Sequence, residues 1–341
     1  MKCCVYTRAF YETPYLDFFI EHYCNLGFDK IIILKSDEFE YNSPDNYKEK
    51  VTIHKIKNLE NRSLSLYDHL VKKSDCDWAL CIDVDEILLL NNNYMNIHQY
   101  INEKTLQNKK INTFYFRWGM IEKLDVETDV VFKNILSDYK IFSNSHIKSM
   151  VKVNKLDSIY HPHMCRLKEK ECIYFENNIL NKNMPTKHPM TKNTYQEHIL
   201  IHLHTRSIHN MITKCLVTAL GNCVRRNVKK IKDLDKFKKL INNNHEESDV
   251  LAKMIDCIGL KAKLPFDHTD LSVSEKKIVK LENYYIYDYR FNIINLNREK
   301  EIINLLLKKH NIDKNKYYEF IERINHKILA KNRFRHQITI D

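Results

Sequence analysis

The N-terminal part of the chain alternates between short apolar segments typical of strands and longer segments typical of helices. Strand-like runs cover residues 3–7, 30–34, 51–56 and 78–82, and helical patterns cover residues 13–27 and 63–71. The order is therefore strand, helix, strand, strand, helix, strand. Such an order predicts a mostly parallel sheet that is flanked by helices, which is an α/β fold.

The first predicted helix has clear signals at both ends. Thr13 and Pro14 are typical of a helix start, because proline is tolerated in the first turn. Gly27 stands where a helix-terminating glycine belongs. Apolar residues recur between them at helical spacing, namely Leu16, Phe19, Ile20, Tyr23 and Leu26.

Composition excludes some common nucleotide-binding classes. The 341 residues are 43% hydrophobic, which is enough for a packed core, but they include only four glycines. Neither G-x-G-x-x-G nor G-x-x-x-x-G-K occurs in the sequence. These absences argue against Rossmann dinucleotide binding and against P-loop NTPase chemistry.

The net charge limits the kinds of binding partner, and the cysteine content indicates the cellular compartment. The formal net charge of +11 favours polyanionic partners such as nucleotide sugars, nucleic acid or an anionic membrane surface, without choosing among them. The ten cysteines form no C-x-x-C pair, and Cys4 and Cys81 lie inside apolar runs. With no apolar segment of signal-peptide length at the start, we expect a cytoplasmic protein with free thiols, either fully in solution or peripheral to a membrane.

The segment Asp83-Val84-Asp85-Glu86 is the strongest functional signal. It follows the buried strand predicted for residues 78–82, and ligands of open α/β sheets bind beyond the carboxyl ends of strands. Side chains two residues apart on a strand point the same way, so we expect Asp83 and Asp85 to lie side by side. A divalent cation that carries a diphosphate fits such a pair, because Mg²⁺ and Mn²⁺ prefer oxygen ligands. The alternative is an ordinary acidic turn after a strand.

Four segments, in the same order along the chain, resemble family 2-like and family 92-like glycosyltransferases. The acidic segment with its preceding strand resembles the W-hydrophobic-D-x-D-E-F-L signature of these enzymes. Two departures are a longer loop after Arg8 and Ile201 where the families usually have Asn. The four similar segments are residues 8–34, residues 78–88, Lys148-Ser149-Met150-Val151-Lys152 and His202-Leu203-His204-Thr205-Arg206-Ser207.

The resemblance implies a GT-A fold that binds a nucleotide-diphosphate sugar, with a UDP-sugar as the expected donor. It implies an Mn²⁺ or Mg²⁺ ion held by Asp83, Asp85 and His202, with His204 as the alternative histidine. Asp83 is also a candidate for the ribose hydroxyls. The remaining candidates for donor binding are Thr7, Arg8, Asp37, Arg62 and Lys148.

An inverting transfer also needs a carboxylate base that deprotonates the acceptor hydroxyl. Glu122 and Asp125 follow the strand predicted for residues 113–118 and are the candidates for this role. Trp118 is a candidate for stacking on a sugar face, with a core position as the alternative. His161 and His163 are assigned to an acceptor-site or structural role rather than to metal binding. The acceptor is expected to be a glycan, a glycolipid or a protein.

The pattern changes near residue 210. We expect residues 1–210 to form the GT-A domain and residues 211–341 to form a mainly helical, basic appendage. Amphipathic helices are predicted for residues 228–240, 299–309 and 317–330. This appendage is a candidate for contact with a membrane or an anionic acceptor, or for homodimer formation.

Two other functions are compatible with parts of the sequence. A nucleic-acid-binding protein would use the basic C-terminal helices, but no signature of nucleic-acid recognition is present, so no nucleic acid is expected as a partner. A metal-dependent phosphoryl-transfer enzyme or nuclease would also use paired aspartates, but it would need further acidic ligands on neighbouring strands.

Overall fold

The computed structural model of the chain describes residues 1–57, 63–121, 141–161, 163–169, 172–180, 194–203, 207–217, 238, 241, 278–279 and 281–323. These residues divide into two compact units. The first unit contains the described residues up to 203 together with those from 278 to 295. The second contains the described residues from 207 to 241 and from 296 to 323.

Four parallel strands form the N-terminal half of the central sheet in the first unit. They are β1 (Cys3–Ala9), β2 (Lys30–Lys35), β3 (Val51–Lys55) and β4 (Trp78–Cys81), in the order β3-β2-β1-β4. The helices α1 (Thr13–Asn25) and α2 (Ser63–Lys72) lie in the connections. The predicted α/β class, with a largely parallel sheet and flanking helices, is confirmed.

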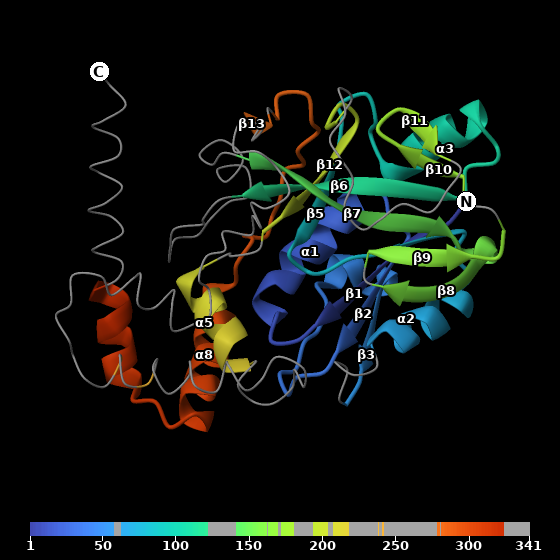
Figure 1. Ribbon diagram of the computed structural model, residues 1–341. Coiled ribbons are helices and arrows are strands. Elements are labelled where there is room, and N and C mark those ends of the chain that lie inside the picture. The colour runs from blue at the N-terminus through green and yellow to red at the C-terminus, as the bar shows by residue number, and fades with distance from the viewer. Residues whose placement is uncertain are drawn as a thin grey trace, which may run out of the picture. The chain divides into compact units, whose positions relative to one another are not determined.

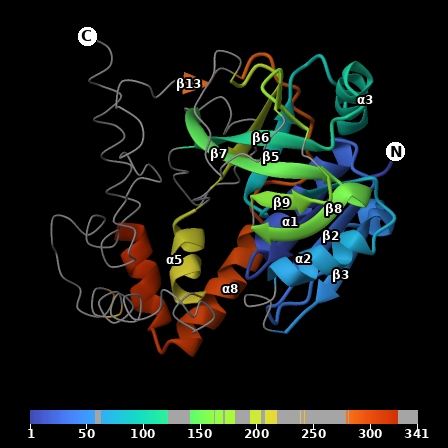
Figure 2. The same ribbon diagram turned by 45° about the vertical axis from the view of Figure 1, so that its right-hand side comes forward.

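The strand order places the two helices on opposite faces of the sheet. The connection from β1 to β2 runs toward the β3 edge of this half of the sheet. The connection from β3 to β4 runs the opposite way, past β2 and β1. Because parallel crossovers are right-handed, α1 and α2 cover opposite faces (Figures 1 and 2). Under α2, a buried apolar cluster joins the sheet to the hairpin of β8 (Leu156–His161) and β9 (Met164–Leu167). This cluster includes Tyr6, Leu34, Val71, Ala79 and Leu167.

The other half of the sheet is mixed in direction. The long strand β7 (Ile141–Lys152) runs antiparallel between β4 and β6 (Thr113–Ile121). Beyond β6 lie β10 (Ile173–Phe175) and β11 (Asn178–Leu180). A second branch pairs β12 (His198–His202) in parallel with β6 and in antiparallel with β5 (Glu86–Leu90), and β13 (Ile278–Val279) pairs with β7. Only β6 of this half is predicted from the sequence.

Three further helical segments lie in the described part of the first unit. The helix α3 (Ile97–Gln107) begins at Asn96, whose side chain accepts a hydrogen bond from the amide of Gln99. The 3₁₀ segments η1 (Asp45–Lys50) and η3 (Val153–Lys155) precede β3 and β8. The cap at Asn96 is the usual way to satisfy an amide of a first helical turn.

The helix α1 is fixed to β5 by polar contacts as well as by its apolar face. The Tyr23 hydroxyl donates to the carbonyl of Glu86 over 2.8 Å, and His22 Nε2 lies 2.8 Å from the carbonyl of Leu88. The chain turns after the helix at Gly27, whose φ of +95° falls in the left-handed region that glycine adopts readily. The predicted glycine end of this helix is confirmed.

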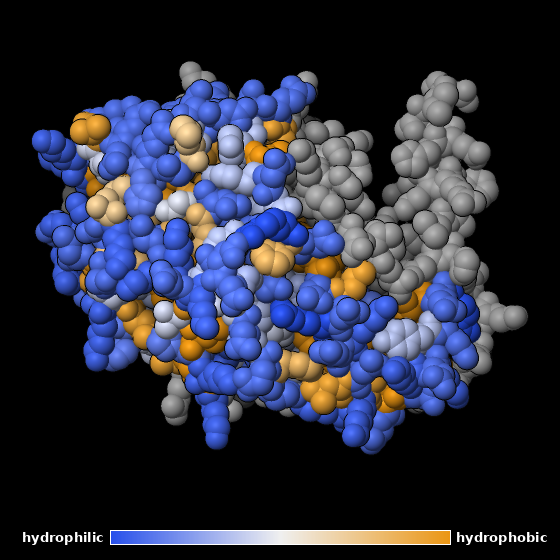
Figure 3. Space-filling view, turned by 180° about the vertical axis from the view of Figure 1, so that it is seen from behind, coloured by the Kyte–Doolittle hydropathy of each residue, from blue (hydrophilic) through white to orange (hydrophobic). Residues whose placement is uncertain are grey.

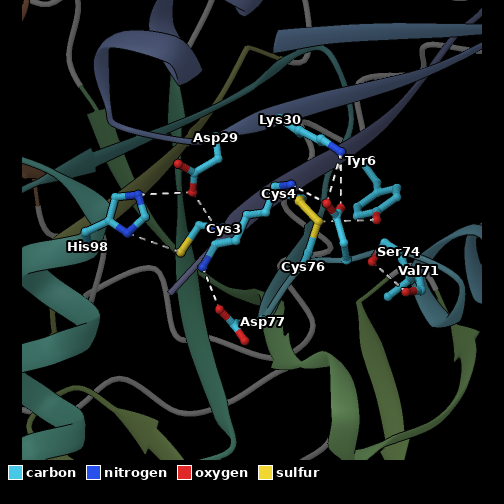
Figure 4. The surroundings of a disulfide bond; sticks show 12 residues. Cys3, Cys4, Tyr6, Asp29, Lys30, Val71, Ser74, Cys76, Asp77 and His98 are labelled. Atoms are coloured by element: carbon cyan, nitrogen blue, oxygen red, sulfur yellow. Dashed lines mark hydrogen bonds and ion pairs between the residues drawn. A yellow bond between two sulfur atoms is a disulfide. The ribbon is translucent and has the colours of Figure 1, made fainter.

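The prediction that all cysteines are free thiols is wrong. A disulfide joins Cys4 of β1 to Cys76, which lies just before β4 (Figure 4). Neighbouring parallel strands bring the two residues together, because Cys4 pairs with Ala79 in the register of β1 and β4. The other described cysteines are free and buried. Sequence spacing gave no sign of this pair, since 72 residues separate the two cysteines.

The second unit is helical in its described part. It contains α5 (Ile208–Val217), α8 (Leu296–Lys309) and a further helix at residues 314–323. The Ser207 hydroxyl donates to Glu299 over 2.6 Å, and His209 Nδ1 lies 2.6 Å from the Tyr317 hydroxyl. The predicted helix at 299–309 is confirmed, and the one at 317–330 is confirmed as far as residue 323. The predicted helix at 228–240 lies almost entirely outside the described residues.

In the part of the chain that the structure describes, every helix is too short or too polar to cross a membrane. On the face seen in Figure 3, hydrophilic side chains predominate and the hydrophobic ones form small groups. Small apolar groups are normal on protein surfaces and do not mark a docking site.

Candidate active site

The predicted acidic segment forms a tight turn at the carboxyl end of β4. The strand ends at Cys81, and residues 84 and 85 are in a turn before β5 begins at Glu86. The amide of Glu86 donates to the carbonyl of Asp83 over 3.1 Å, and the amide of Asp83 donates to Glu86 Oε2 over 2.8 Å. Because the backbone turns here, the two aspartates contact different partners.

Asp83 lies between two cations. Its Oδ1 is 3.2 Å from Arg8 Nε at the end of β1, and its Oδ2 is 3.0 Å from Lys148 Nζ of β7. Lys148 also lies 3.2 Å from Glu86 Oε2. The sheet register explains this position, since Leu80 pairs with Met150, and two residues further along Lys148 comes alongside the start of the turn.

The contact between Lys148 and Glu86 is buried, whereas the contact between Arg8 and Asp83 is partly exposed. Lys148 is 1% exposed and Glu86 is fully buried. Burial alone opposes ionisation of Asp83, but Lys148 and Arg8 together hold the pKa of its carboxyl well below the ordinary value. Burial raises the pKa of Glu86 to about 7, against the opposite effect of Lys148. Desolvation also disfavours a charged Lys148, yet Asp83 and Glu86 raise its pKa above the usual lysine value.

Asp85 faces a histidine instead. Its Oδ1 lies 3.6 Å from His202 Nε2, and its carbonyl accepts a hydrogen bond from the amide of Leu203 over 2.7 Å. The pairing of β5 with β12 sets this geometry, because His202 is opposite Glu86 in the register. Both side chains are nearly buried. The structure brings Asp85 and His202 together, and metal binding by these two residues stays a prediction.

Aromatic rings gather beside His202. The Trp118 ring lies 4.2 Å from that of His202 and is stacked on that of His146 at 5.0 Å, measured between centroids. His163 meets Trp118 edge-on at 5.2 Å and contacts the carbonyl of Ile147 through Nδ1 at 2.7 Å. A carbonyl only accepts, so Nδ1 of His163 carries the proton. Burial lowers the pKa of His163 to about 4, which keeps the ring neutral.

Several buried polar atoms lack a hydrogen-bond partner among the described residues. They include Thr7 Oγ1, the Tyr67 hydroxyl, Glu86 Oε1 and Trp118 Nε1. Thr7 is next to Arg8 on β1. Burial, and to a smaller extent the charge of Asp83, raises the pKa of the Tyr67 hydroxyl. Buried polar groups are nearly always satisfied in native proteins, so these four atoms are exceptions.

The structure gives Asp37 a role inside the protein. Its carboxylate is fully buried, pairs with Lys35, and accepts hydrogen bonds from the amides of Tyr11 and Phe39. These contacts hold the loops that follow β1 and β2. Base binding by Asp37 stays a prediction.

His161 lies at the end of β8, where its Nδ1 accepts a hydrogen bond from the amide of His163 over 3.2 Å. Four further predicted residues lie outside the described part of the chain. They are Arg62, Glu122, Asp125 and His204.

The charges of the turn fit a cation together with a diphosphate. Three carboxylates, those of Asp83, Asp85 and Glu86, face the two cations Arg8 and Lys148. The group therefore has no excess of positive charge for a diphosphate. A divalent ion uses one or two carboxylates together with substrate phosphates and water. Asp85 and His202 are the residues present that would hold such an ion, because Asp83 is occupied by its two cations.

Three contributors to the site are not predicted from the sequence as site residues. Tyr67 is indistinguishable from the other buried residues of a helix, and Glu86 is noticed only as part of the acidic run. His146 lies on β7, which no sequence pattern indicates. A strand that carries polar residues such as Ser143, Asn144 and Lys148 in buried positions lacks the apolar run that identifies strands.

Comparisons with known proteins give distant likenesses only. No protein-family model and no curated protein matches the chain. A crystal structure of S. aureus TarS, residues 1–349, aligns with 81% of this chain and 77% of that chain at 8% identity and a TM-score of 0.30. In complex with UDP-GlcNAc, the same protein aligns over the same shares at 9% identity and a TM-score of 0.32.

A structure of CMP:2-keto-3-deoxy-manno-octonic acid synthetase complexed with CTP covers 45% of this chain and 75% of that chain. The identity is 12% and the TM-score is 0.26. The observed α/β arrangement agrees with the fold class expected from the sequence. At these scores the likenesses carry no argument about fold or function, and we infer the function from the residues of the site.

Proposed function

We propose that the chain is a metal-dependent glycosyltransferase that uses a nucleotide-diphosphate sugar, with a UDP-sugar as the donor. The observation that supports this function best is the acidic turn at the end of β4, where Asp85 meets His202 and Asp83 meets two cations. The turn lies at the carboxyl end of a central parallel strand, which is where open α/β sheets bind ligands.

Each group around the turn has a role that suits its contacts. Thr7 and Tyr67 carry buried hydroxyls that have no partner among the described residues, and these hydroxyls would contact the nucleoside. Arg8, whose side chain is 43% exposed, is free to reach a phosphate while it contacts Asp83. Asp85 and His202 would hold Mn²⁺ or Mg²⁺. When bound, such an ion neutralises charge that develops on the departing diphosphate.

The transfer requires one bond to form and one to break at the anomeric carbon. The acceptor hydroxyl attacks this carbon, the bond from carbon to the diphosphate oxygen breaks, and the electron pair leaves with the nucleoside diphosphate. The hydroxyl proton goes to a carboxylate base. Glu122 and Asp125 remain the proposed bases, and attack opposite the leaving group inverts the anomeric centre.

The acceptor is a glycan, a glycolipid or a protein hydroxyl. Contact of the basic C-terminal region with an anionic acceptor or a membrane surface, and pairing of two copies, remain predictions from charge.

A nuclease or phosphoryl-transfer enzyme is less well supported. Two of the three carboxylates at the turn, those of Asp83 and Glu86, are already paired with Lys148, and Asp83 is also paired with Arg8, so neither is offered as an additional metal ligand.

A panel of nucleotide sugars tests the proposal. The chain is incubated with each donor and Mn²⁺, and the release of nucleoside diphosphate is measured with and without a chelator. We expect metal-dependent release from one UDP-sugar above the others, and a loss of at least about 100-fold in Asp85→Asn, since this variant removes a charge from the metal shell. Release that is insensitive to both the chelator and the substitution would refute the proposal.

A further inference from the structure

A second group of metal-ligating side chains lies at the amino end of β1, apart from the turn. It consists of Cys3, Asp29 and His98. In the described residues this is the only place where three His, Cys, Asp or Glu ligand atoms lie within 4.8 Å of one another. The three residues come from three segments: the start of β1, the loop before β2 and the first turn of α3.

The three side chains lie against one another, and His98 contacts Cys3 and Asp29 through different ring nitrogens (Figure 4). Cys3 Sγ lies 3.9 Å from His98 Nδ1, and His98 Nε2 lies 3.1 Å from Asp29 Oδ2. Zinc–sulfur and zinc–nitrogen bonds of about 2.3 and 2.0 Å in a tetrahedron place ligand atoms roughly 3.3–3.6 Å apart. These two separations involve different nitrogens of His98, so the ring must turn for one nitrogen to face both Cys3 and Asp29. One ligand atom of each of the three residues already lies within 4.8 Å of the others.

The surrounding backbone fixes the three residues before any ion is present. The amide of Cys3 donates to Asp29 Oδ2 over 2.7 Å, and the amide of Asp29 donates to the carbonyl of Cys3 over 2.9 Å. Gly27 lets α3 approach, since a Cβ there would lie 3.0 Å from Asn96 and 3.6 Å from the ring of His98. Such preorganisation reduces the cost of gathering the ligands.

The chemistry of the group selects zinc. Thiolate and imidazole are soft and borderline ligands that suit Zn²⁺, whereas Mg²⁺ and Mn²⁺ prefer oxygen. The Cys3 side chain is fully buried, while those of His98 and Asp29 are 28% and 38% exposed, so one side is open to a water molecule as the fourth ligand. We propose that Cys3, Asp29 and His98 form a zinc site that ties β1, the loop before β2 and α3 together.

Cobalt binding tests the site independently of the proposed function. The full chain is titrated with Co²⁺, and absorption is recorded. We expect a thiolate-to-cobalt charge-transfer band in the near ultraviolet that saturates at one equivalent and is displaced by Zn²⁺. Asp85 and His202 carry no sulfur, so cobalt bound by these two side chains gives no such band.

Variants and matched controls decide the assignment. His98→Ala keeps the thiol and should lose the band, as should Cys3→Ser. Cys24→Ser removes another buried free thiol, and His69→Ala removes an exposed histidine, so both should keep it. Zinc should raise the melting temperature of the wild type and leave that of His98→Ala unchanged. A wild-type chain without the band, or a band that survives both His98→Ala and Cys3→Ser, would overturn the zinc site.

Discussion

At the scale of single residues, Lys148 has a larger structural role in the candidate site than the sequence indicates. The sequence predicts a phosphate or acceptor contact for this lysine. In the structure its ammonium group is buried between Asp83 and Glu86, at 3.0 and 3.2 Å. A buried cation of this kind holds the two carboxylates in place. Removing it leaves Glu86 without a cation and leaves Asp83 with Arg8 alone.

Lys148→Met should therefore destabilise the protein by about 3–5 kcal/mol, as expected when one partner of a buried ion pair is lost. Urea denaturation measures this change. Lys155→Met is the matched control, because Lys155 pairs with Glu169 at the surface and should contribute less than about 1 kcal/mol. Adding Glu86→Gln to Lys148→Met should restore part of the loss. Equal urea midpoints for wild type and Lys148→Met would contradict this account of the site.

His22 gives a residue-scale prediction about pH. Burial lowers its pKa from 6.5 to about 4, so the unfolded chain binds more protons than the folded chain between these values. The stability that neutral, buried His22 preserves is therefore fully present above pH 6.5. It is lost as the pH falls through 4, and the free energy of unfolding decreases by up to about 3 kcal/mol.

Denaturation series between pH 4 and pH 7 measure this effect. His22→Gln should flatten the loss of stability on acidification, because glutamine can still contact the carbonyl of Leu88 and does not titrate. Substituting the exposed His69 in the same way should leave the acid limb unchanged. If wild type and His22→Gln lose stability in parallel, the assignment of this limb to His22 is wrong.

At the scale of elements, the parallel strands were predictable and the antiparallel ones were not. The apolar runs of β1, β2 and β4 mark strands that are buried on both faces, and proline and glycine mark the ends of α1. The strand β7 instead buries the polar residues Ser143, Asn144 and Lys148. In the sequence alone this segment resembles a polar loop, because the buried site that these residues line is not visible. The position of Lys148 follows from pairing between β7 and β4, and no local pattern encodes that register.

The disulfide between β1 and the segment before β4 is an element-scale feature with a measurable effect. Peptide mapping without reductant should recover the Cys4–Cys76 peptide. Reduction should destabilise the chain by about 2–4 kcal/mol, because the crosslink restricts the unfolded state. Cys76→Ala should be insensitive to reductant, with Cys172→Ala as the control that keeps the bridge. Equal stability of the wild type with and without reductant would show that the bridge is absent or makes no net contribution.

At the scale of the whole molecule, the sequence predicts one α/β unit with a nucleotide site and a helical region after it. The described residues contain both an α/β unit and a helical unit. The segment from 281 to 295, close in sequence to α8, belongs instead to the first unit, where the amide of Arg290 donates to Glu21 over 3.0 Å. Such a return of the chain is set by tertiary packing, and no break in composition marks it.

The central claim is that the turn at Asp85 binds a nucleoside diphosphate through a divalent ion. Calorimetric titration of the full chain with UDP, in Mn²⁺ and in chelator, tests it most directly, with Asp85→Asn and the exposed Asp157→Asn as a matched pair. We predict binding only with Mn²⁺, unchanged in Asp157→Asn and weakened at least about tenfold in Asp85→Asn, which corresponds to about 1.4 kcal/mol. Equal UDP affinity with and without the metal, or in wild type and Asp85→Asn, would contradict the claim.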